Sequence, residues 1–583
     1  MITMRLKITK SKNAQSLYVI RSTYENGKHS SKIVEKLGTL SELSKIHSDP
    51  ISWAKAYIQQ LNFQEKEASR KVNIQFSQST TITKDTQKLF NIGYLFLQQI
   101  YFMLGLNKIT SNISSKYNFS FNLDSILSRL IYSRIIFPSS KLSTTKESKK
   151  FLEQPDFELQ HVYRALDIIA KEDAFIQSEL YKNSCAISKR NSKILFYDCT
   201  NFFFESECQS GIRQYGCSKE HRPSPIVEMG LFMDGDGIPL AFSIFPGNKN
   251  EQQSLIPLEQ QIIKDFSHSK FVVCTDAGLS SLQNRIFNNK TDRAFITTQS
   301  IKKLKTYIQE WCMDPHAWYA EGYDTEFDIS SLEANETLIE RYKNTIFFKE
   351  RWIKENGLEQ KLIVTFSLKY KFYQQNIRKN QVDRAKKIIA DSPTNLKSNN
   401  ANDCKRFITK TSITQDGEIA KKTTLSINED RIANEAKYDG FYAVCTNLDE
   451  NAYTIANINR NRWEIEECFR IMKTDFEARP VYLHNDERIK AHFTTCFLSL
   501  IIFRYLEKKL DHRYTSTEII KTLRSMNLTD VGHEGFIPSY TRTDLTDSLH
   551  EAFGFHTDYE IISKKSMKNI FKLTKSTSKS THN

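Results

Sequence analysis

Two short apolar runs in the middle of the chain, each carrying an aspartate, constrain the fold more than any other feature. Residues 194–200 read ILFYDCT and contain Asp198, and residues 270–276 read KFVVCTD and end in Asp276. Both runs have the length and the β-branched and aromatic content of buried strands. In a mixed sheet flanked by helices, ligands bind where strands run out into loops. We therefore expect both aspartates at such strand ends.

The segments around these runs form an ordered series. In chain order they predict a strand at 194–200, strands at 226–233 and 239–245 joined by the turn DGDG, a helix at 252–266, a strand at 270–276, a helix after Gly278 and a strand at 293–298. Three sequential strands followed by helix-linked strands are what a ribonuclease-H-like α/β domain requires. The final helix of such a domain should carry a third acid.

Residues 457–475 contain no Gly or Pro and predict the helix that supplies this acid. At about 100° per residue, Arg462, Glu466 and Lys473 fall within about 40° of one another and share one stripe. The adjoining stripe is apolar and should be buried; it consists of Ile465, Phe469, Met472 and Phe476. Taken alone, the pattern also fits an amphipathic surface helix with an ordinary pair between Arg462 and Glu466.

Three carboxylates that converge from two strand ends and one helix can hold Mg²⁺ or Mn²⁺, which prefer hard oxygen ligands. Two such ions, about 3.5–4 Å apart, activate an attacking hydroxyl and stabilise the leaving oxygen of an in-line displacement. We therefore predict Asp198, Asp276 and Glu466 as catalytic metal ligands. Arg462 and Lys473 are predicted to bind DNA by neutralising and positioning its backbone phosphate.

At 583 residues the chain exceeds a single core, and its patterns divide it into six regions. They are a basic β-hairpin region at 1–45 with its turn at Asn26 and Gly27, a helical region at 46–190 that is a candidate for DNA binding, the first part of the ribonuclease-H-like core at 191–300, an inserted β-rich subdomain at 301–440, the last part of the core with the catalytic helix at 441–510, and a C-terminal region with a basic tail at 511–583. Helical spacing is clearest at 85–106, 123–136 and 161–171.

The insertion is rich in Lys, Arg, Trp and Tyr, which suits contact with nucleic acid through phosphate pairing and base stacking. On the plainer interpretation, Trp311, Trp318 and Trp352 fill a core of its own. Residues 564–583 contain six Lys and no acid, which predicts a flexible basic tail.

The composition indicates which kind of partner and which compartment to expect. The 82 basic and 68 acidic residues give a net charge of +14, which favours a polyanionic partner. Ten Cys without a C-x-x-C pair fit free thiols in a reducing cytoplasm. A zinc site built from Cys199, Cys208, Cys217 and His221 would lack the close ligand pairs of structural zinc sites. The apolar runs are too short or too interrupted to span a bilayer, so we expect no membrane segment.

The same residues match a known family. Arg462, Glu466 and Lys473 fit in register the signature Y-x2-R-x3-E-x6-K, which marks one group of DDE insertion-sequence transposases with a β-strand insertion. Asn459 stands where the tyrosine of the signature belongs. Other blocks also resemble the family; they are YDCT at 197–200, YGCSKEHRP at 215–223, GIPL at 237–240, FPGN at 245–248, TDAGL at 275–279 and RP at 479–480.

The resemblance implies a transposase that nicks the ends of a mobile element and joins the freed 3′-hydroxyl to target DNA. Its implied partners are double-stranded DNA, as terminal inverted repeats and as target, and a second copy of the chain in a synaptic complex. It implies a bacterial cytoplasmic protein that associates with the nucleoid on DNA. A hairpin at the element end is one implied intermediate, with an aromatic residue of the insertion stacked on a displaced base.

Two other classes of protein fit parts of the pattern. A catalytically silent or domesticated DNA-binding protein would keep the fold, and only a cleavage assay separates it from an active enzyme. A glycosidase with paired carboxylates would need two acids without the Arg and Lys partners or the basic charge. DNA affinity that falls steeply with salt would separate the DNA-binding classes from the glycosidase.

Overall fold

The computed structural model describes the chain apart from a few short segments. The backbone is described outside residues 1–3, 12–13, 26–27, 46, 48, 69–70, 392–401, 414–418 and 577–583, and side chains are described outside these and outside 23–29, 63–64, 66–70 and 412–424. The chain divides into two compact units, and each is described by itself. The smaller unit consists of residues 1–90, 527–540 and 556–571, and the larger one of the remaining residues.

The smaller unit begins with a three-stranded antiparallel sheet, as its alternating basic and apolar residues predict. Strand β2 (Gln15–Glu25) lies between β1 (Met4–Lys10) and β3 (Lys28–Thr39). Helix α2 (Pro50–Ala68) packs on one face of this sheet, where Val19 and Ile58 are buried together. The predicted turn residues Asn26 and Gly27 lie outside the described residues.

The larger unit is built on a nine-stranded sheet in the order β10-β11-β12-β15-β9-β8-β5-β6-β7. The half that comes first in the sequence consists of β5 (Ile194–Phe203), β6 (Ile226–Asp234), β7 (Pro239–Pro246), β8 (Phe271–Thr275) and β9 (Arg293–Gln299). Strands β5, β6 and β7 are antiparallel neighbours, whereas β8 and β9 run parallel to β5. Helix α9 (Leu255–Asp265) precedes β8, and α10 (Leu282–Phe287) precedes β9. This is the predicted ribonuclease-H-like arrangement, so the fold prediction is confirmed.

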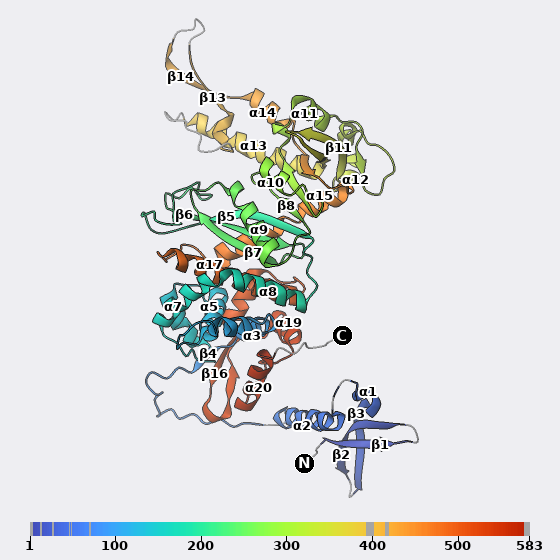
Figure 1. Ribbon diagram of the computed structural model, residues 1–583, viewed down its shortest axis with the longest axis vertical. Coiled ribbons are helices and arrows are strands. Elements are labelled where there is room, and N and C mark those ends of the chain that lie inside the picture. Colours follow the sequence, from blue (N-terminus) through green and yellow to red (C-terminus); the bar gives the residue numbers. More distant parts are fainter. Residues whose placement is uncertain are drawn as a thin grey trace. The chain divides into compact units, whose positions relative to one another are not determined.

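Helices cover both faces of this half of the sheet (Figure 1). On one face, Tyr197 and Cys199 of β5 are buried in a cluster with residues of α9. On the other face, Phe202 and Phe242 pack on rings of α17 (Asp486–Lys509), each with ring centres 4.8 Å apart. Side chains alternate between the two faces of a strand, so Asp198 lies on the α17 side.

Helix α17 is the only helix among the described residues that is long and apolar enough to cross a membrane by length and composition. Within the protein, 94% of its apolar window is buried, which is the environment of a core helix.

The predicted helical region precedes the sheet. It consists of α3 (Tyr94–Met103), α4 (Leu106–Ser114), α5 (Leu123–Ile136), α6 (Lys141–Glu147), α7 (Leu159–Lys171) and α8 (Asp173–Ile187). The prediction that residues 85–93 begin a helix is wrong, because β4 (Leu89–Asn91) occupies part of this segment. The Asn91 amide donates to the Leu523 and Met526 carbonyl oxygens, and such tertiary pairing outweighs local helical spacing.

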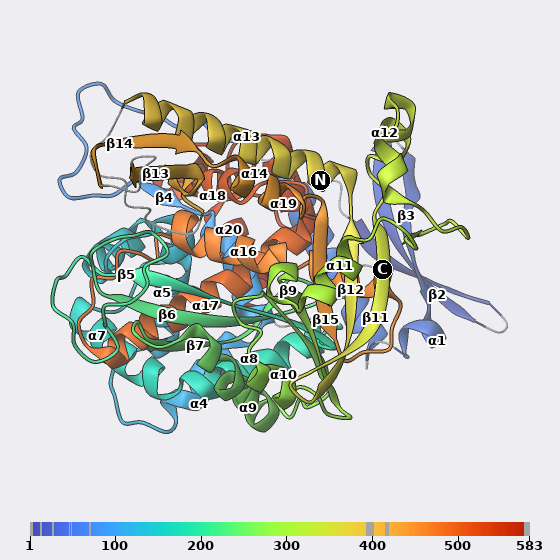
Figure 2. The same ribbon diagram turned by 90° about the horizontal axis from the view of Figure 1, so that it is seen from above.

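The first strands of the insertion extend the same sheet, whereas its last two strands pair with each other in a separate two-stranded sheet (Figure 2). Its strands are β10 (Tyr319–Ala320), β11 (Phe347–Glu355), β12 (Leu358–Phe366), β13 (Ile408–Ile413) and β14 (Ile419–Ile427), and β15 (Phe441–Thr446) returns the chain to β9. The insertion also contains helices α11 (Thr306–Met313), α12 (Glu336–Tyr342), α13 (Leu368–Ala390) and α14 (Glu429–Ala436), so it is less β-rich than expected.

The C-terminal part is more ordered than the tail prediction implies. After α18 (Ser516–Ser525) and α19 (Asp544–Phe553), residues predicted to start a flexible tail form helix α20 (Lys564–Thr574). Residues 577–583 lie outside the described part of the chain.

Candidate active site

The two predicted aspartates lie next to each other on neighbouring parallel strands. Tyr197 of β5 pairs in register with Thr275 of β8, so Asp198 and Asp276 stand one step further along both strands. Neighbouring strands lie about 4.8 Å apart, which places the two residues side by side. Asp276 directly follows β8, as expected. Asp198 does not end its strand, because β5 continues along its antiparallel partner β6 to Phe203.

Both aspartates face the side of the sheet where the predicted helix packs. Cys274, two residues before Asp276, contacts Asn459 of α15 (Ala452–Arg460), with its Sγ 3.5 Å from the Asn459 Oδ1. Residues two apart in a strand point to the same face, so Asp276 faces α15 as well. The sheet therefore aims both carboxyl groups at residues 452–475.

Arg462 joins the second aspartate to the predicted third acid. One of its terminal nitrogens lies 3.5 Å from the Asp276 Oδ1 and 4.0 Å from the Glu466 Oε1. The Arg462 side chain is only 15% exposed, whereas that of Glu466 is 63% exposed. Arg462 Nε is buried without a hydrogen-bond partner among the described residues. The structure thus brings four of the five predicted site residues together, while their roles stay predictions.

Asp198 is buried and lies close to other charged side chains, and both conditions shift its pKa. Burial raises the pKa of Asp198 to about 6, and the neighbouring charge of Asp276 acts in the same direction. Lys219 and Arg462 oppose this rise. Burial alone would lower the pKa of Arg462, but nearby groups that include Asp276, Tyr442 and Asp198 outweigh it and raise that pKa. Clustered acids next to a cation are a common electrostatic feature of functional sites.

The predicted helix at 457–475 is broken once and then widened, so its continuity was predicted wrongly. Helix α15 ends at Arg460, and α16 (Trp463–Arg470) begins after a tight turn in which the Arg462 N–H bonds to the Asn459 carbonyl. Residues Ile471–Asp475 then form a π-helix. The apolar stripe of Ile465, Phe469, Met472 and Phe476 is buried as predicted, and the most exposed of these residues, Phe469, is 6% exposed.

Lys473 lies on the π-helix. Its Nζ lies 3.9 Å from a carboxylate oxygen of Glu220 and 5.6 Å from the centre of the Phe202 ring. Burial and the charge of Lys219 lower the pKa of Lys473 to about 8. Local widening of a helix is frequent at functional sites, and here it directs the lysine toward the side of β5 that holds Asp198.

Three residues near Asp198 were missed by reasoning from the sequence. Lys219 donates to the Cys199 carbonyl over 2.6 Å and pairs with Glu251 at 2.9 Å. Glu228 lies within β6 and is 5% exposed. Its burial and, to a smaller extent, the charge of Glu251 raise its pKa to about 7. A lone acid inside an apolar strand, and a lysine in the family-like block at 215–223, were the available signals.

Comparison with known proteins assigns this constellation to a family. The model of the transposase DDE domain matches residues 189–502, which is more than half of the chain. The chain belongs to the transposase DDE domain family. The match begins before β5 and ends within α17, so the DDE domain contains all five predicted site residues.

Other comparisons add little to the family assignment. A cryo-EM structure of a piggyBac transposase synaptic complex with hairpin DNA is similar over 84% of this chain and 87% of that chain. Its sequence identity is 8% and its TM-score 0.36, too low to support an inference about this DDE domain. No curated protein matches the chain.

The residue that departs from the signature has a specific partner in this DDE domain. Asn459 donates through its amide to the Tyr442 hydroxyl over 3.0 Å, and that hydroxyl lies 2.6 Å from the Thr298 Oγ1. A tyrosine hydroxyl therefore stands beside Arg462, but it comes from β15 and not from position 459.

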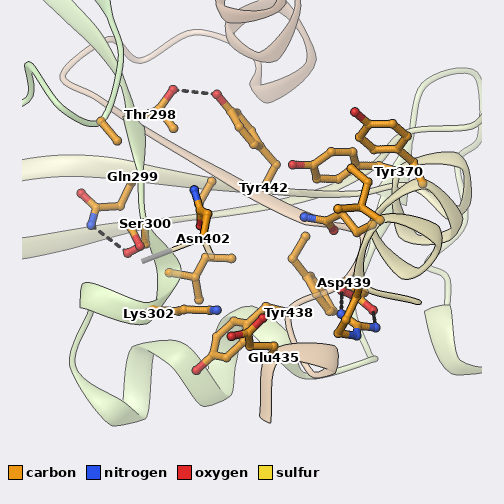
Figure 3. Close-up of a pocket in the computed structure, with 18 of the residues that line it drawn as sticks. Thr298, Gln299, Ser300, Lys302, Tyr370, Asn402, Glu435, Tyr438, Asp439 and Tyr442 are labelled. Carbon is orange, nitrogen blue, oxygen red and sulfur yellow. Dashed lines mark hydrogen bonds and ion pairs between the residues drawn. The ribbon is translucent and has the colours of Figure 1, made fainter. Parts of the chain in front are cut away.

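A cavity of about 560 Å³ opens next to these groups (Figure 3). It extends from Ala277, the neighbour of Asp276, to α13, and its lining includes Tyr370, Tyr373, Tyr438 and Tyr442. Of the three Trp that were candidates for stacking, Trp318 is fully buried and donates to the Asp314 carbonyl, whereas Trp352 is 44% exposed. Trp318 therefore fills the core of the insertion, as the plainer interpretation held.

Proposed function

We propose that the chain is an insertion-sequence transposase that cuts the ends of its element and joins the 3′-hydroxyl to target DNA. The observation that carries this proposal is the meeting of Asp198, Asp276 and Glu466 around Arg462 in a domain of the DDE family. Members of the DDE family depend on divalent metal ions. Asp198, Asp276 and Glu466 are the residues that we assign to hold two Mg²⁺ or Mn²⁺ ions.

The donor set fits such ions. Carboxylate oxygens are the ligands that Mg²⁺ and Mn²⁺ prefer. The neighbouring acids Asp198 and Asp276 repel each other, and a bound cation relieves that repulsion. When bound, the ions supply activation of the attacking hydroxyl and stabilisation of the leaving oxygen. The open position of Glu466, which is 63% exposed, leaves this side of the site accessible to DNA.

The protein's own residues bind and orient the substrate. Asp276 and Glu466 hold the Arg462 guanidinium in one conformation, so it is already oriented toward the reacting phosphate when DNA binds. Lys473 adds a positive charge on the Asp198 side. Fixed positive groups of this kind position backbone phosphates of the bound strand, and a group beside the reacting phosphate, as proposed for Arg462, also stabilises the charge that develops on it.

The proposed partners are double-stranded DNA, as terminal inverted repeats and as target, and a second copy of the chain in the synaptic complex. The net charge of +14 supports a DNA partner. We place the protein in the bacterial cytoplasm, on the nucleoid when bound to DNA. Whether the element end passes through a hairpin is a question for the cleavage products.

The decisive experiment compares Asp198→Ala, Asp276→Ala and Glu466→Ala with the unchanged protein on DNA that carries the element's own ends. Each variant should lose Mg²⁺-dependent strand cleavage and keep most of its DNA affinity, and a chelator should stop cleavage by the unchanged protein. Asp292→Ala is the matched control, because Asp292 is 56% exposed and pairs with Lys270 outside the site.

Normal cleavage by any of the three variants would remove that residue from the site. DNA binding by the unchanged protein without any metal-dependent cleavage would instead establish a catalytically silent DNA-binding protein of the same fold.

A further inference from the structure

Three cations meet on one carboxylate beside the proposed active site. The Glu220 carboxylate lies 3.9 Å from the Lys473 Nζ and 3.8 Å from the Arg222 Nε, and it also forms an ion pair with Arg479. All four side chains come from the DDE domain. The cations come from three separate segments: the loop before β6, the π-helix after α16 and the stretch between that π-helix and α17.

We call Glu220, Arg222, Lys473 and Arg479 the junction. Residues at the end of β5 hold it in place. The Arg222 guanidinium lies 4.1 Å from the centre of the Phe203 ring and that of Arg479 lies 5.7 Å from it. The Val481 N–H bonds to the Phe203 carbonyl over 3.2 Å, which fixes the stretch that carries Arg479. Cations over aromatic faces are attracted to them and oriented by them.

The loop that carries Glu220 is shaped by its own hydrogen bonds. The Ser218 hydroxyl accepts from the backbone N–H groups of Glu220 and Arg222, each over 3.3 Å. His221, between them, has a φ of 55°, in the left-handed region. The loop therefore presents Glu220 and Arg222 from a tight turn, and the carboxylate reaches the junction from outside the sheet.

The charges at the junction do not balance. Three cations face the Glu220 carboxylate, and Glu228 and Asp198 act on Lys473 from further away, which leaves an excess of positive charge around Glu220. Lys219, the next cation along the loop, is already paired with Glu251. The Lys473 and Arg479 side chains are only 14% and 22% exposed, so water screens their charges weakly. Such a partly buried excess of positive charge is suited to an anion with more charge than one carboxylate brings.

The junction lies at a useful distance from the acids. Phe202 and Phe203 follow Asp198 by four and five residues on the same strand, which is about 13–17 Å at the rise of a β-strand. A DNA strand covers that length in about four or five nucleotides at an axial rise of about 3.4 Å. A strand whose scissile phosphate lies at the acids can therefore place another phosphate at the junction.

We propose that Lys473, Arg222 and Arg479 form a binding site for a backbone phosphate of DNA, and that Glu220 occupies this site in the DNA-free protein. The proposal rests on the proposed function, because it assigns a part of the same DNA path. On binding, the phosphate takes the place of the Glu220 carboxylate, and the loop turns that side chain away. Glu220 thus competes with DNA and lowers its affinity.

An ordinary ion-pair network that closes the loop onto the domain predicts the opposite behaviour. In that case, removal of the Glu220 charge would loosen the three cations and weaken DNA binding or leave it unchanged. In our proposal the same change strengthens binding, because the competitor is lost.

The test is the affinity of Glu220→Gln for double-stranded DNA, measured by fluorescence anisotropy across a salt series with chelator present, so that cleavage plays no part. We expect Glu220→Gln to bind DNA about tenfold more tightly than the unchanged protein, because the substitution removes a negative charge next to the bound phosphate. The matched control is Glu251→Gln, which removes an acid of similar exposure that pairs with Lys219 instead. It should tighten binding much less.

A double variant identifies the cations. In Glu220→Gln with Arg479→Gln, the gain from the first change should largely vanish, because the cation that receives the phosphate is missing. A thermal unfolding curve of each variant verifies that the domain is folded.

Several outcomes would overturn the proposal. They are equal or weaker binding by Glu220→Gln, equal tightening by Glu251→Gln, and a gain that persists without Arg479. If the unchanged protein binds DNA and cleaves it while Glu220→Gln binds no better, only this inference fails. If the unchanged protein does not bind DNA even at low salt, the proposed function fails with it.

Discussion

The two halves of the nine-stranded sheet differ in strand direction and in exposure: the half that contains β5, β8 and β9 has parallel pairs, whereas the half that contains β12 and β15 is antiparallel throughout. In the half formed by β7, β6, β5, β8 and β9, strands are covered on both faces, and all nine residues of β6 are buried. In the half formed by β15, β12, β11 and β10, β11 is exposed at Glu350, Arg351 and Trp352. The proposed metal ligands belong to the first half and to the helix packed on it, whereas the tyrosines around the cavity lie on α13 (Tyr370 and Tyr373), before β15 (Tyr438) and on β15 (Tyr442).

This difference separates two tasks. Carboxylates that must hold ions at fixed spacing gain from buried strands, because packing on both sides allows little movement. Side chains that follow a DNA strand gain from an exposed and adaptable surface. Arg462 and Tyr442 lie at the border between the halves, since Arg462 contacts Asp276 of one half and Tyr442 belongs to β15 of the other.

The largest effect should come from the border residue that joins the acids. Arg462→Ala leaves Asp276 and Glu466 without their shared cation, and we expect cleavage to fall by about 10²–10³-fold. Arg460→Ala, which removes an exposed arginine two residues away, should leave cleavage nearly unchanged. Measurement of single-turnover cleavage rates compares the two. Equal losses would mean that general positive charge, and not the border position, is what matters.

A smaller effect on DNA affinity should come from a change of pH, through the charge of Lys473. Its pKa, lowered to about 8, means that the free protein loses this charge as pH rises through 8, while bound phosphate favours the charged form. DNA affinity should therefore fall by about tenfold between pH 7 and pH 9, at about one order per pH unit above the pKa of the free lysine. Lys473→Arg should flatten this slope, because arginine stays charged. An unchanged slope in that variant would assign the titration to another group.

The next effect should come from a substitution of Tyr442, the tyrosine at the border between the two halves. Tyr442→Phe removes the hydroxyl that accepts from Asn459 and meets Thr298, which leaves a buried amide unpaired at a cost of about 1–3 kcal/mol. We expect cleavage to fall about tenfold with DNA affinity little changed. Asn459→Ala in the same background should add little, since the pair then acts as one unit. Fully additive losses in a double-mutant cycle would show that the two residues act separately.

The smallest effect should come from helix α13 of the insertion, on which Tyr373 lies. Tyr373 lines the cavity and is 60% exposed, and Tyr373→Ala should weaken DNA binding about fivefold if it stacks on a base. Its phenylalanine variant keeps the ring and should bind normally. A loss in Tyr373→Phe as large as that in Tyr373→Ala would indicate that the hydroxyl, and not the ring, makes the contact.

Much of the fold could be predicted because it depends on local patterns. The runs at 194–200 and 270–276 are apolar enough to be strands in any globular context, and the buried stripe of Ile465, Phe469, Met472 and Phe476 follows from helical spacing alone. The insertion was harder. The pairing of β12 with β15, which joins the insertion to the core sheet, depends on residues 75 and more positions apart, which no local pattern encodes.

The sequence by itself determined the order of strands and helices, the positions of the three acids and the face that residues 457–475 bury, because periodicity and side-chain chemistry are local properties. Only the tertiary structure decided that Asp198 lies within β5, that the helix breaks at Arg462 and widens at Lys473, and that Tyr442 meets Asn459. It also decided that Glu220 meets Lys473 and Arg479. These contacts join segments far apart in the chain, so strand register and packing, not neighbouring residues, fix them.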